Sequence, residues 1–237
     1  MRLVAEQLTV NFGGLLAIAD VDIDIGPGEI VGLIGANGAG KSTLVNVLSG
    51  FQKTRTGSVK LGDSVLLGLS PDRIARAGVV RTFQSVRLFS GISVRDNVAA
   101  AAAVLGSRSE SVDTLLQLLD LADRPDSDAG SLPYAHQRRL AIARALALKP
   151  KFLLLDEPAA GMSPNEIEDL DRTLVALRDR TGMGLLLIEH NINLVMSICE
   201  RLVVLDGGRV IARGDPDAIK SNTAVKDAYL GAEGGGH

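Results

Sequence analysis

The segment GANGAGKST, residues 35–43, has the residue types and spacing of a loop that wraps around phosphate groups. It fits the pattern G-x-x-x-x-G-K-[ST], and it lies between the apolar run EIVGLIG and the helix-like run KSTLVNVLSG. Glycines let the backbone curl and point N–H groups inward, and the helix N-terminus adds partial positive charge. We expect Lys41 to reach the β- and γ-phosphates of a nucleotide and the Ser42 hydroxyl to ligate Mg²⁺. The predicted contacts are Gly35, Ala36, Asn37, Gly38, Ala39, Gly40, Lys41, Ser42 and Thr43.

Two neighbouring acids end the apolar segment FLLLDEP, residues 152–158. In open α/β sheets ligands bind at the carboxyl ends of the strands, so this segment would bring both carboxylates beside the phosphate loop. We predict that Asp156 ligates Mg²⁺, directly or through water, and that Glu157 accepts a proton from the attacking water. Without the phosphate loop, the pair would be explained equally well as two acids between a strand and a helix.

A histidine and a glutamine follow two further predicted strands. His190 comes after the apolar run LLLIE, where it can donate to the γ-phosphate and position a water molecule. Gln84, in RTFQSVRLF, can ligate Mg²⁺ through its side-chain carbonyl and sense the γ-phosphate. A lone histidine is more often structural, and a lone glutamine carries no signal, so both predictions depend on the phosphate loop.

The patterning of the chain predicts a scaffold that brings these strand ends together. The N-terminal runs RLVAEQLTV and IADVDIDI alternate partially, as strands do, and the middle of the chain, from Ser93, is helical. The last third alternates strands and helices, one of which opens with a capping box from Ser163 to Glu166. This order predicts an α/β fold with a mostly parallel sheet and an inserted helical subdomain. The expected boundaries are 1–84 and 148–230 for the strands and core, about 85–147 for the helical subdomain, and 231–237 for a disordered tail.

Composition narrows the class of protein. The net charge of −3 over 237 residues gives no electrostatic case for nucleic-acid binding. The single cysteine excludes an internal disulfide and fits a reducing compartment. No apolar run approaches the roughly 20 residues that span a bilayer, and the N-terminus lacks the apolar segment of a signal peptide. We therefore expect a soluble, cytoplasmic chain that is still able to dock on a membrane protein.

The four segments, in this order, resemble those of the ATP-binding subunits of ABC transporters over nearly the whole chain. GANGAGKST is similar to the Walker A segment, RTFQ to the Q-loop, FLLLDEP to Walker B and LIEHN to the switch-histidine loop. The resemblance implies ATP and Mg²⁺ as cofactors and a P-loop NTPase (RecA-like) parallel-sheet core. It also implies an N-terminal antiparallel β-subdomain and an inserted α-helical subdomain. Phe12 in NFGG would stack on adenine, although a phenylalanine there also fits a core position.

The resemblance gives a meaning to SLPYAHQRRLAIARALA, residues 131–147, which alone would be a basic surface helix. It lies where the family signature LSGGQ contacts the ATP of a partner subunit. Pro133, Ala135 and His136 depart from the usual LSYGQ of the subfamily, and Ser163 stands where Asp or Asn is common. We expect a weakened anion site, because the Ala135 methyl group hinders close backbone approach. The signature residues are Leu132, Pro133, Tyr134, Ala135 and His136.

Longer strings, including GVVRTFQSVRLFSGISVRDNV and DEPAAGM, resemble the LivG-like ATPases of branched-chain amino acid importers. The resemblance implies uptake of branched-chain or related amino acids and a peripheral position on the inner face of the cell membrane. The implied partners are a second ATPase in a heterodimer, two transmembrane permease subunits and an extracytoplasmic solute-binding protein, with no nucleic acid. Two alternatives stay open: a catalytically weak or regulatory ATP-binding subunit, and a non-transport ABC ATPase.

Overall fold

Two sheets organise the chain in the computed structural model, which describes residues 1–104, 111–190 and 192–233. An antiparallel sheet has the strand order β2-β1-β4-β5, and a second sheet has the order β10-β9-β3-β8-β7-β6. In the second sheet only β9 and β10 pair antiparallel among the described ladders. The strands are β1 (Leu3–Phe12), β2 (Leu15–Ile25), β3 (Ile30–Gly35), β4 (Thr56–Leu61), β5 (Ser64–Val65), β6 (Val79–Arg81), β7 (Phe152–Asp156), β8 (Gly184–Ile188), β9 (Arg201–Asp206) and β10 (Arg209–Gly214).

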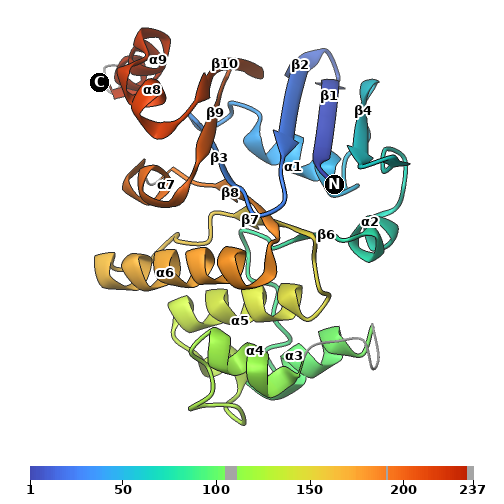
Figure 1. The fold of residues 1–237 in the computed structure, drawn as a ribbon, viewed down its shortest axis with the longest axis vertical. Coiled ribbons are helices and arrows are strands. Elements are labelled where there is room, and N and C mark those ends of the chain that lie inside the picture. The colour runs from blue at the N-terminus through green and yellow to red at the C-terminus, as the bar shows by residue number, and fades with distance from the viewer. Residues whose placement is uncertain (105–110, 191, 234–237) are drawn as a thin grey trace.

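The helices occupy the positions that the patterning predicts. Figure 1 shows α3, α4 and α5 together at one end of the molecule and β1, β2 and β4 at the other. Ser163 forms the expected capping box with Glu166 at the start of α6. The helices are α1 (Lys41–Leu48), α2 (Pro71–Ala77), α3 (Val94–Ala102), α4 (Val112–Leu118), α5 (Tyr134–Leu146), α6 (Pro164–Thr181), α7 (Ile192–Ile198), α8 (Pro216–Ser221) and α9 (Thr223–Glu233). No helix in the described ranges is long and apolar enough to cross a membrane.

Three parallel strands carry the predicted site residues to one edge of the larger sheet. Every residue of β3, β7 and β8 is buried, which is typical of parallel strands covered on both faces. β8 pairs in parallel with both β3 and β7, so the carboxyl ends of all three strands lie side by side. The phosphate loop, the acids after Leu155 and the segment 189–190 therefore meet, although they are distant in sequence.

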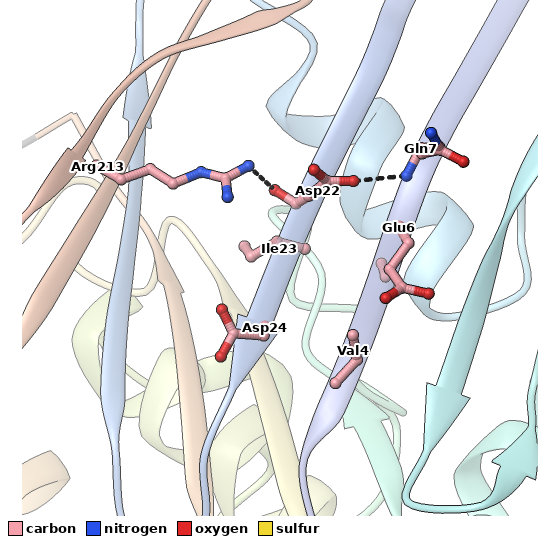
Figure 2. Close-up of a pocket in the computed structure, with 8 residues that line it drawn as sticks. Val4, Glu6, Gln7, Asp22, Ile23, Asp24 and Arg213 are labelled. Atoms are coloured by element: carbon pink, nitrogen blue, oxygen red, sulfur yellow. Dashed lines mark hydrogen bonds between the residues drawn. The ribbon is translucent and has the colours of Figure 1, made fainter.

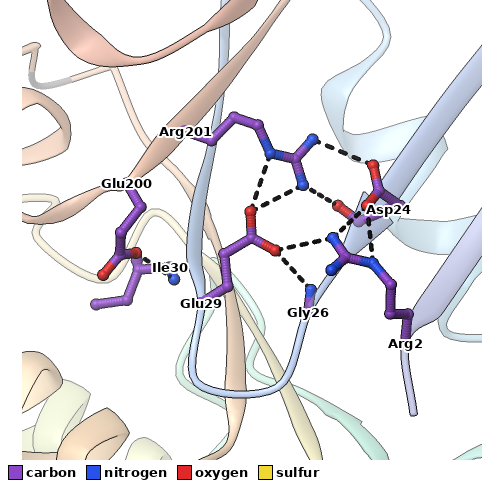
Figure 3. Close-up of polar contacts among 7 residues, drawn as sticks. All are labelled: Arg2, Asp24, Gly26, Glu29, Ile30, Glu200 and Arg201. Carbon is purple, nitrogen blue, oxygen red and sulfur yellow. Dashed lines mark hydrogen bonds and ion pairs between the residues drawn. The ribbon is translucent and has the colours of Figure 1, made fainter.

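Arginine side chains join the two sheets. Arg201, on β9, donates to Glu29 at 2.9 Å and to the backbone oxygen of Asp24 on β2 at 2.7 Å, and Arg2 completes the network (Figure 3). On the neighbouring strand, Arg213 donates to the backbone oxygen of Asp22 at 2.7 Å (Figure 2). These contacts fix β2 against β9 and β10, and β2 in turn supplies one wall of the site.

The helical segment packs on the sheet, so α5 is not a surface helix. Leu140 and Ile142 of α5 belong to the same apolar cluster as Leu153 and Leu155 of β7. Even Arg138 is only 4% exposed. The boundaries of the helical subdomain at about 85 and 147 stay a prediction.

α9 continues through Glu233 and so overlaps residues 231–233 of the predicted tail, 231–237, which stays a prediction. Ala232 and Glu233 favour helix, and the single Gly231 does not stop it. The rest of the predicted tail, 234–237, lies outside the described residues.

Replacing Asn97 tests how the segment after Gln84 is attached. The Asn97 side chain is fully buried on α3, accepts the Phe89 N–H at 3.0 Å and donates to the Phe89 carbonyl at 2.9 Å. Asn97→Ala leaves both backbone groups without this partner, so we expect a loss of about 1–3 kcal/mol in the free energy of unfolding. Urea denaturation measures it, with exposed Gln117→Ala as the control. Equal losses in the two variants would contradict this attachment.

Candidate active site

The phosphate loop connects β3 directly to α1 and depends on glycine at its last turn. Gly40 caps α1 with φ 103°, a left-handed conformation. A Cβ atom there would lie 2.7 Å from the Ala17 carbonyl oxygen and from a methyl group of Ile18. Gly38 is also left-handed, with φ 82°. The loop therefore holds the tight conformation that the sequence pattern predicts, with the N-terminus of α1 at its end.

Lys41 is held over its own loop. Its ammonium group donates to the backbone oxygens of Gly35 at 2.6 Å and Ala36 at 2.9 Å, and the residue is only 8% exposed. Burial lowers the pKa of Lys41, while the nearby carboxylates of Glu157 and Asp156 act in the opposite direction. The Lys41 ammonium thus lies among the backbone carbonyl groups of the loop and near the carboxylates of Asp156 and Glu157.

A cavity of about 600 Å³ opens over this loop, a size that is typical of small-molecule sites. Leu15 and Leu16 of β2 form an apolar wall, and both side chains are exposed. Phe12 pairs with Leu15 across the β1–β2 turn and is 48% exposed, so it is not a core phenylalanine. The cavity lining is Leu15, Leu16, Ala17, Asn37, Gly38, Ala39, Gly40, Lys41, Ser42, Thr43, Gln84, Glu157, Gly207 and Gly208.

The turn between β9 and β10 lines one side of the cavity, a role that the sequence does not predict. Gly208 donates its N–H to the Ala39 oxygen at 3.1 Å and accepts from the Ala19 N–H at 2.8 Å. Its φ is 77°, and a Cβ atom would lie 2.7 Å from the Ala17 oxygen. The sequence indicates only a hairpin turn here. The one available signal is the second glycine of Asp206-Gly207-Gly208.

The two acids at the end of β7, Asp156 in the strand and Glu157 directly after it, have separate environments. Asp156 is 5% exposed, and one of its carboxylate oxygens accepts from Arg81 at 2.6 Å. Glu157 has φ 49°, donates its N–H to the Ile188 oxygen at 2.9 Å and lines the cavity. Gln84 donates its side-chain nitrogen to the Glu157 carboxylate at 2.8 Å. The left-handed backbone at Glu157 therefore leaves one carboxylate in the interior and brings the other to the cavity.

Five residues predicted to contact this chain's own nucleotide or metal are absent from the described cavity lining: Phe12, Gly35, Ala36, Asp156 and His190. Asp156 lies below the surface beside Arg81, and His190 is exposed just beyond β8. The buried acid before it, Glu189, accepts the Ala159 N–H at 2.8 Å and so ties the end of β8 to the loop after Glu157. The structure brings the loop, Gln84 and Glu157 together, and it places His190 and Asp156 at the same sheet edge.

The donor set fits a magnesium ion. A hydroxyl (Ser42), an amide oxygen (Gln84) and a carboxylate (Asp156) are hard oxygen ligands, which Mg²⁺ prefers. Within the described residues, no group of three or more His, Cys, Asp or Glu side chains is able to hold a metal. Such a sparse protein contribution is typical of Mg²⁺ that binds together with substrate phosphates.

The SLPYAH segment starts α5 with Pro133 as the residue before the helix. Tyr134 is 44% exposed, and its hydroxyl accepts from Arg138 at 2.6 Å. The methyl group of Ala135 is buried, and the His136 side chain is partly buried. Burial, with Arg124 and Arg139 nearby, lowers the pKa of His136, so this ring is neutral at pH 7. The start of the helix therefore offers backbone N–H groups and no side-chain cation from His136.

Comparison with protein families gives two matches. The family described as ABC transporter matches residues 18–160, and the family described as branched-chain amino acid ATP-binding cassette transporter matches residues 209–235. The chain is 42% identical to the high-affinity branched-chain amino acid transport ATP-binding protein LivG of Escherichia coli K12, over 97% of each chain. It is 40% identical to BraF of Pseudomonas aeruginosa, which carries the same description, again over 97% of each chain.

Solved structures agree with these sequence matches. The ADP conformation of MJ1267, an ATP-binding cassette of an ABC transporter, superimposes with a TM-score of 0.88 at 29% identity. This match covers 98% of the present chain and 99% of the other. A nucleotide-free ATP-binding cassette superimposes with a TM-score of 0.86 at 28% identity, covering 97% and 99% of the two chains.

Proposed function

Because the chain belongs to the family of ABC transporter ATPases, we propose that it powers an importer of branched-chain or related amino acids. The observation that carries the proposal is the shared cavity of the phosphate loop, Gln84 and Glu157. Relatives over nearly the whole length, LivG and BraF, are named for branched-chain amino acid transport, which supports the solute class. The solute itself does not contact this subunit in the proposed arrangement.

Each predicted catalytic, metal-binding or adenine-contacting residue has a task in the proposed ATP hydrolysis, whether it lines the cavity or lies at its edge. Backbone N–H groups of residues 37–43 and the Lys41 ammonium hold the phosphates. Ser42, Gln84 and Asp156 would hold Mg²⁺, which offsets the charge of the phosphates when it is bound. Glu157 accepts the proton of the attacking water, and Gln84 orients the Glu157 carboxylate through their 2.8 Å hydrogen bond. His190, at the neighbouring strand end, steadies the γ-phosphate, and Phe12 at the rim stacks on adenine.

The proposed assembly is a heterodimer with a second ATPase, docked on two permease subunits and served by a solute-binding protein. Two ATPases close head to tail, and each signature segment contacts the nucleotide of the other subunit. Residues 85–89, which follow Gln84 and of which Ser85, Arg87 and Phe89 are exposed, would contact the permease on the inner face of the membrane. Closure of the ATPase dimer then favours one conformational state of the permease, and ATP hydrolysis lets the dimer open again.

A catalytically weak subunit is the second candidate, and the start of α5 favours it. Ala135 places a buried methyl group where a glycine would let the backbone approach a phosphate. Pro133 has no N–H to donate, and the lowered pKa of His136 keeps that ring neutral at pH 7. These features weaken the site that this chain offers to its partner's ATP, and they leave its own Glu157 site complete.

Glu157→Gln tests the proposed hydrolysis. The amide keeps the size of the side chain and removes the proton acceptor, so ATP binding should persist and the closed dimer should accumulate. We expect turnover at this site to fall about 100-fold or more in the assembled transporter. Steady-state ATPase and equilibrium ATP binding measure the two effects, with exposed Glu168→Gln on α6 as the matched control. Unchanged hydrolysis would exclude Glu157 as the base.

Restoring the signature tests the inequality of the two ATP sites. In a Glu157→Gln background, the remaining turnover comes from the partner's nucleotide, which faces α5 of this chain. Ala135→Gly with His136→Gln should raise that turnover about tenfold, because closer backbone donors stabilise the transition state better. Ala141→Gly, farther along α5, controls for the loss of helix propensity. If the restored signature leaves turnover at the control level, the departures have no catalytic effect.

A further inference from the structure

Arg81, at the end of β6, holds Asp156 in a buried ion pair that the proposed ATPase cycle leaves unused. The guanidinium donates to a carboxylate oxygen at 2.6 Å, and both side chains are only 7% exposed. A second arm of the guanidinium donates to the Asn46 side chain on α1, and the group lies 4.9 Å from the centre of the Phe83 ring. Arg81 is thus fixed from three sides beside the acid that is predicted to hold Mg²⁺.

The register of the sheet builds this pair. β6 runs parallel to β7, with Arg81 opposite Leu154, and the next residue, Thr82, donates its N–H to the Leu154 oxygen at 2.9 Å. This pairing brings Arg81 level with the end of β7, where Asp156 stands. A buried arginine is tolerated when its charge is paired, and Asp156 supplies the opposite charge.

The charges in this part of the site cancel. Arg81 pairs with Asp156, and the cation Lys41 lines the same cavity as the anion Glu157, so two cations stand against two anions. Mg²⁺ loses its water reluctantly, so a site without net negative charge does not collect it. A bound nucleotide adds the negative charge of its phosphates, and the balance then favours a divalent cation.

We propose that Arg81 is a positioning residue that pairs with Asp156 so that the site takes a divalent cation only together with a nucleotide. It orients the Asp156 carboxylate through one oxygen and cancels its charge until phosphates arrive. The proposal rests on the proposed function, because it assumes that Asp156 faces Mg²⁺ during ATP hydrolysis. It adds that metal binding is conditional, and it names the residue responsible.

Binding of Mn²⁺ without nucleotide tests the proposal, because Mn²⁺ accepts the same oxygen ligands and its free concentration is measured by electron paramagnetic resonance. Arg81→Gln keeps hydrogen-bonding ability and removes the charge, so Mn²⁺ alone should bind about tenfold more tightly than to the wild type. Arg81→Lys keeps the charge and should bind Mn²⁺ as weakly as the wild type does.

Adding Asp156→Asn to Arg81→Gln should abolish the gain in Mn²⁺ affinity. Mg²⁺ without nucleotide should also raise the melting temperature of Arg81→Gln and not that of the wild type.

Equal Mn²⁺ affinity of Arg81→Gln and the wild type would overturn the proposal, as would a gain in Arg81→Lys. If Arg81→Gln fails to fold, the Mn²⁺ affinity of the wild type without nucleotide still tests the proposal. Tight binding of Mn²⁺ to the wild type without nucleotide would contradict the conditional site. Mn²⁺ with ATP and the wild type is the separate check on the proposed function. If Mn²⁺ with ATP does not bind to the wild type, the proposed nucleotide site is wrong. If only the Arg81 variants give the contradicting result, the proposed role of Arg81 alone is wrong.

Discussion

The parallel hydrogen-bonded ladder β3-β8-β7 is the constraint on which the rest of the structure depends. Its register puts the carboxyl ends of three buried strands at one edge, and each strand is followed by residues of a different chemistry. The phosphate loop follows β3, Asp156 ends β7 with Glu157 directly after it, and His190 follows β8. The side chains of these strands are apolar up to Asp156, the last residue of β7, so their burial fixes the positions of the strands. The polar residues at and after the strand ends therefore lie at the edge of the sheet.

The surrounding elements complete the site through backbone contacts and paired charges. The turn at Gly207–Gly208 joins the phosphate loop to β2, and the arginine network of Figure 3 holds β2 against β9. The Arg81–Asp156 pair adds a fourth strand, β6, to the same edge. The segment after Gln84 is then tied to α3 through Asn97. Hydrogen bonds therefore connect the helical part to the segment after Gln84, and Gln84 in turn to Glu157.

Much of this arrangement can be predicted from the sequence, because local patterns determine it. Short runs of sequence are enough to predict three features: the phosphate loop, the acids at a strand end and the capping box at Ser163. The contacts that the sequence does not reveal depend on tertiary pairing. Arg81 meets Asp156 only through the β6–β7 register, and Gly208 meets Ala39 only through the position of β9. The sequence does not predict that α9 extends through residue 233, because the glycine-rich composition of the last residues outweighs the helix preference of the residues around Gly231.

The most direct test of the central claim is ATP turnover by the chain assembled with its permeases and second ATPase in membranes. If the chain is the ATPase of an amino acid importer, turnover should be slow for the isolated chain. It should rise about tenfold or more when a solute-binding protein loaded with leucine is added to the assembled complex. Glu157→Gln should lower the stimulated rate. Turnover by the isolated chain as fast as that of the stimulated complex, or no response to the loaded binding protein, would contradict the account.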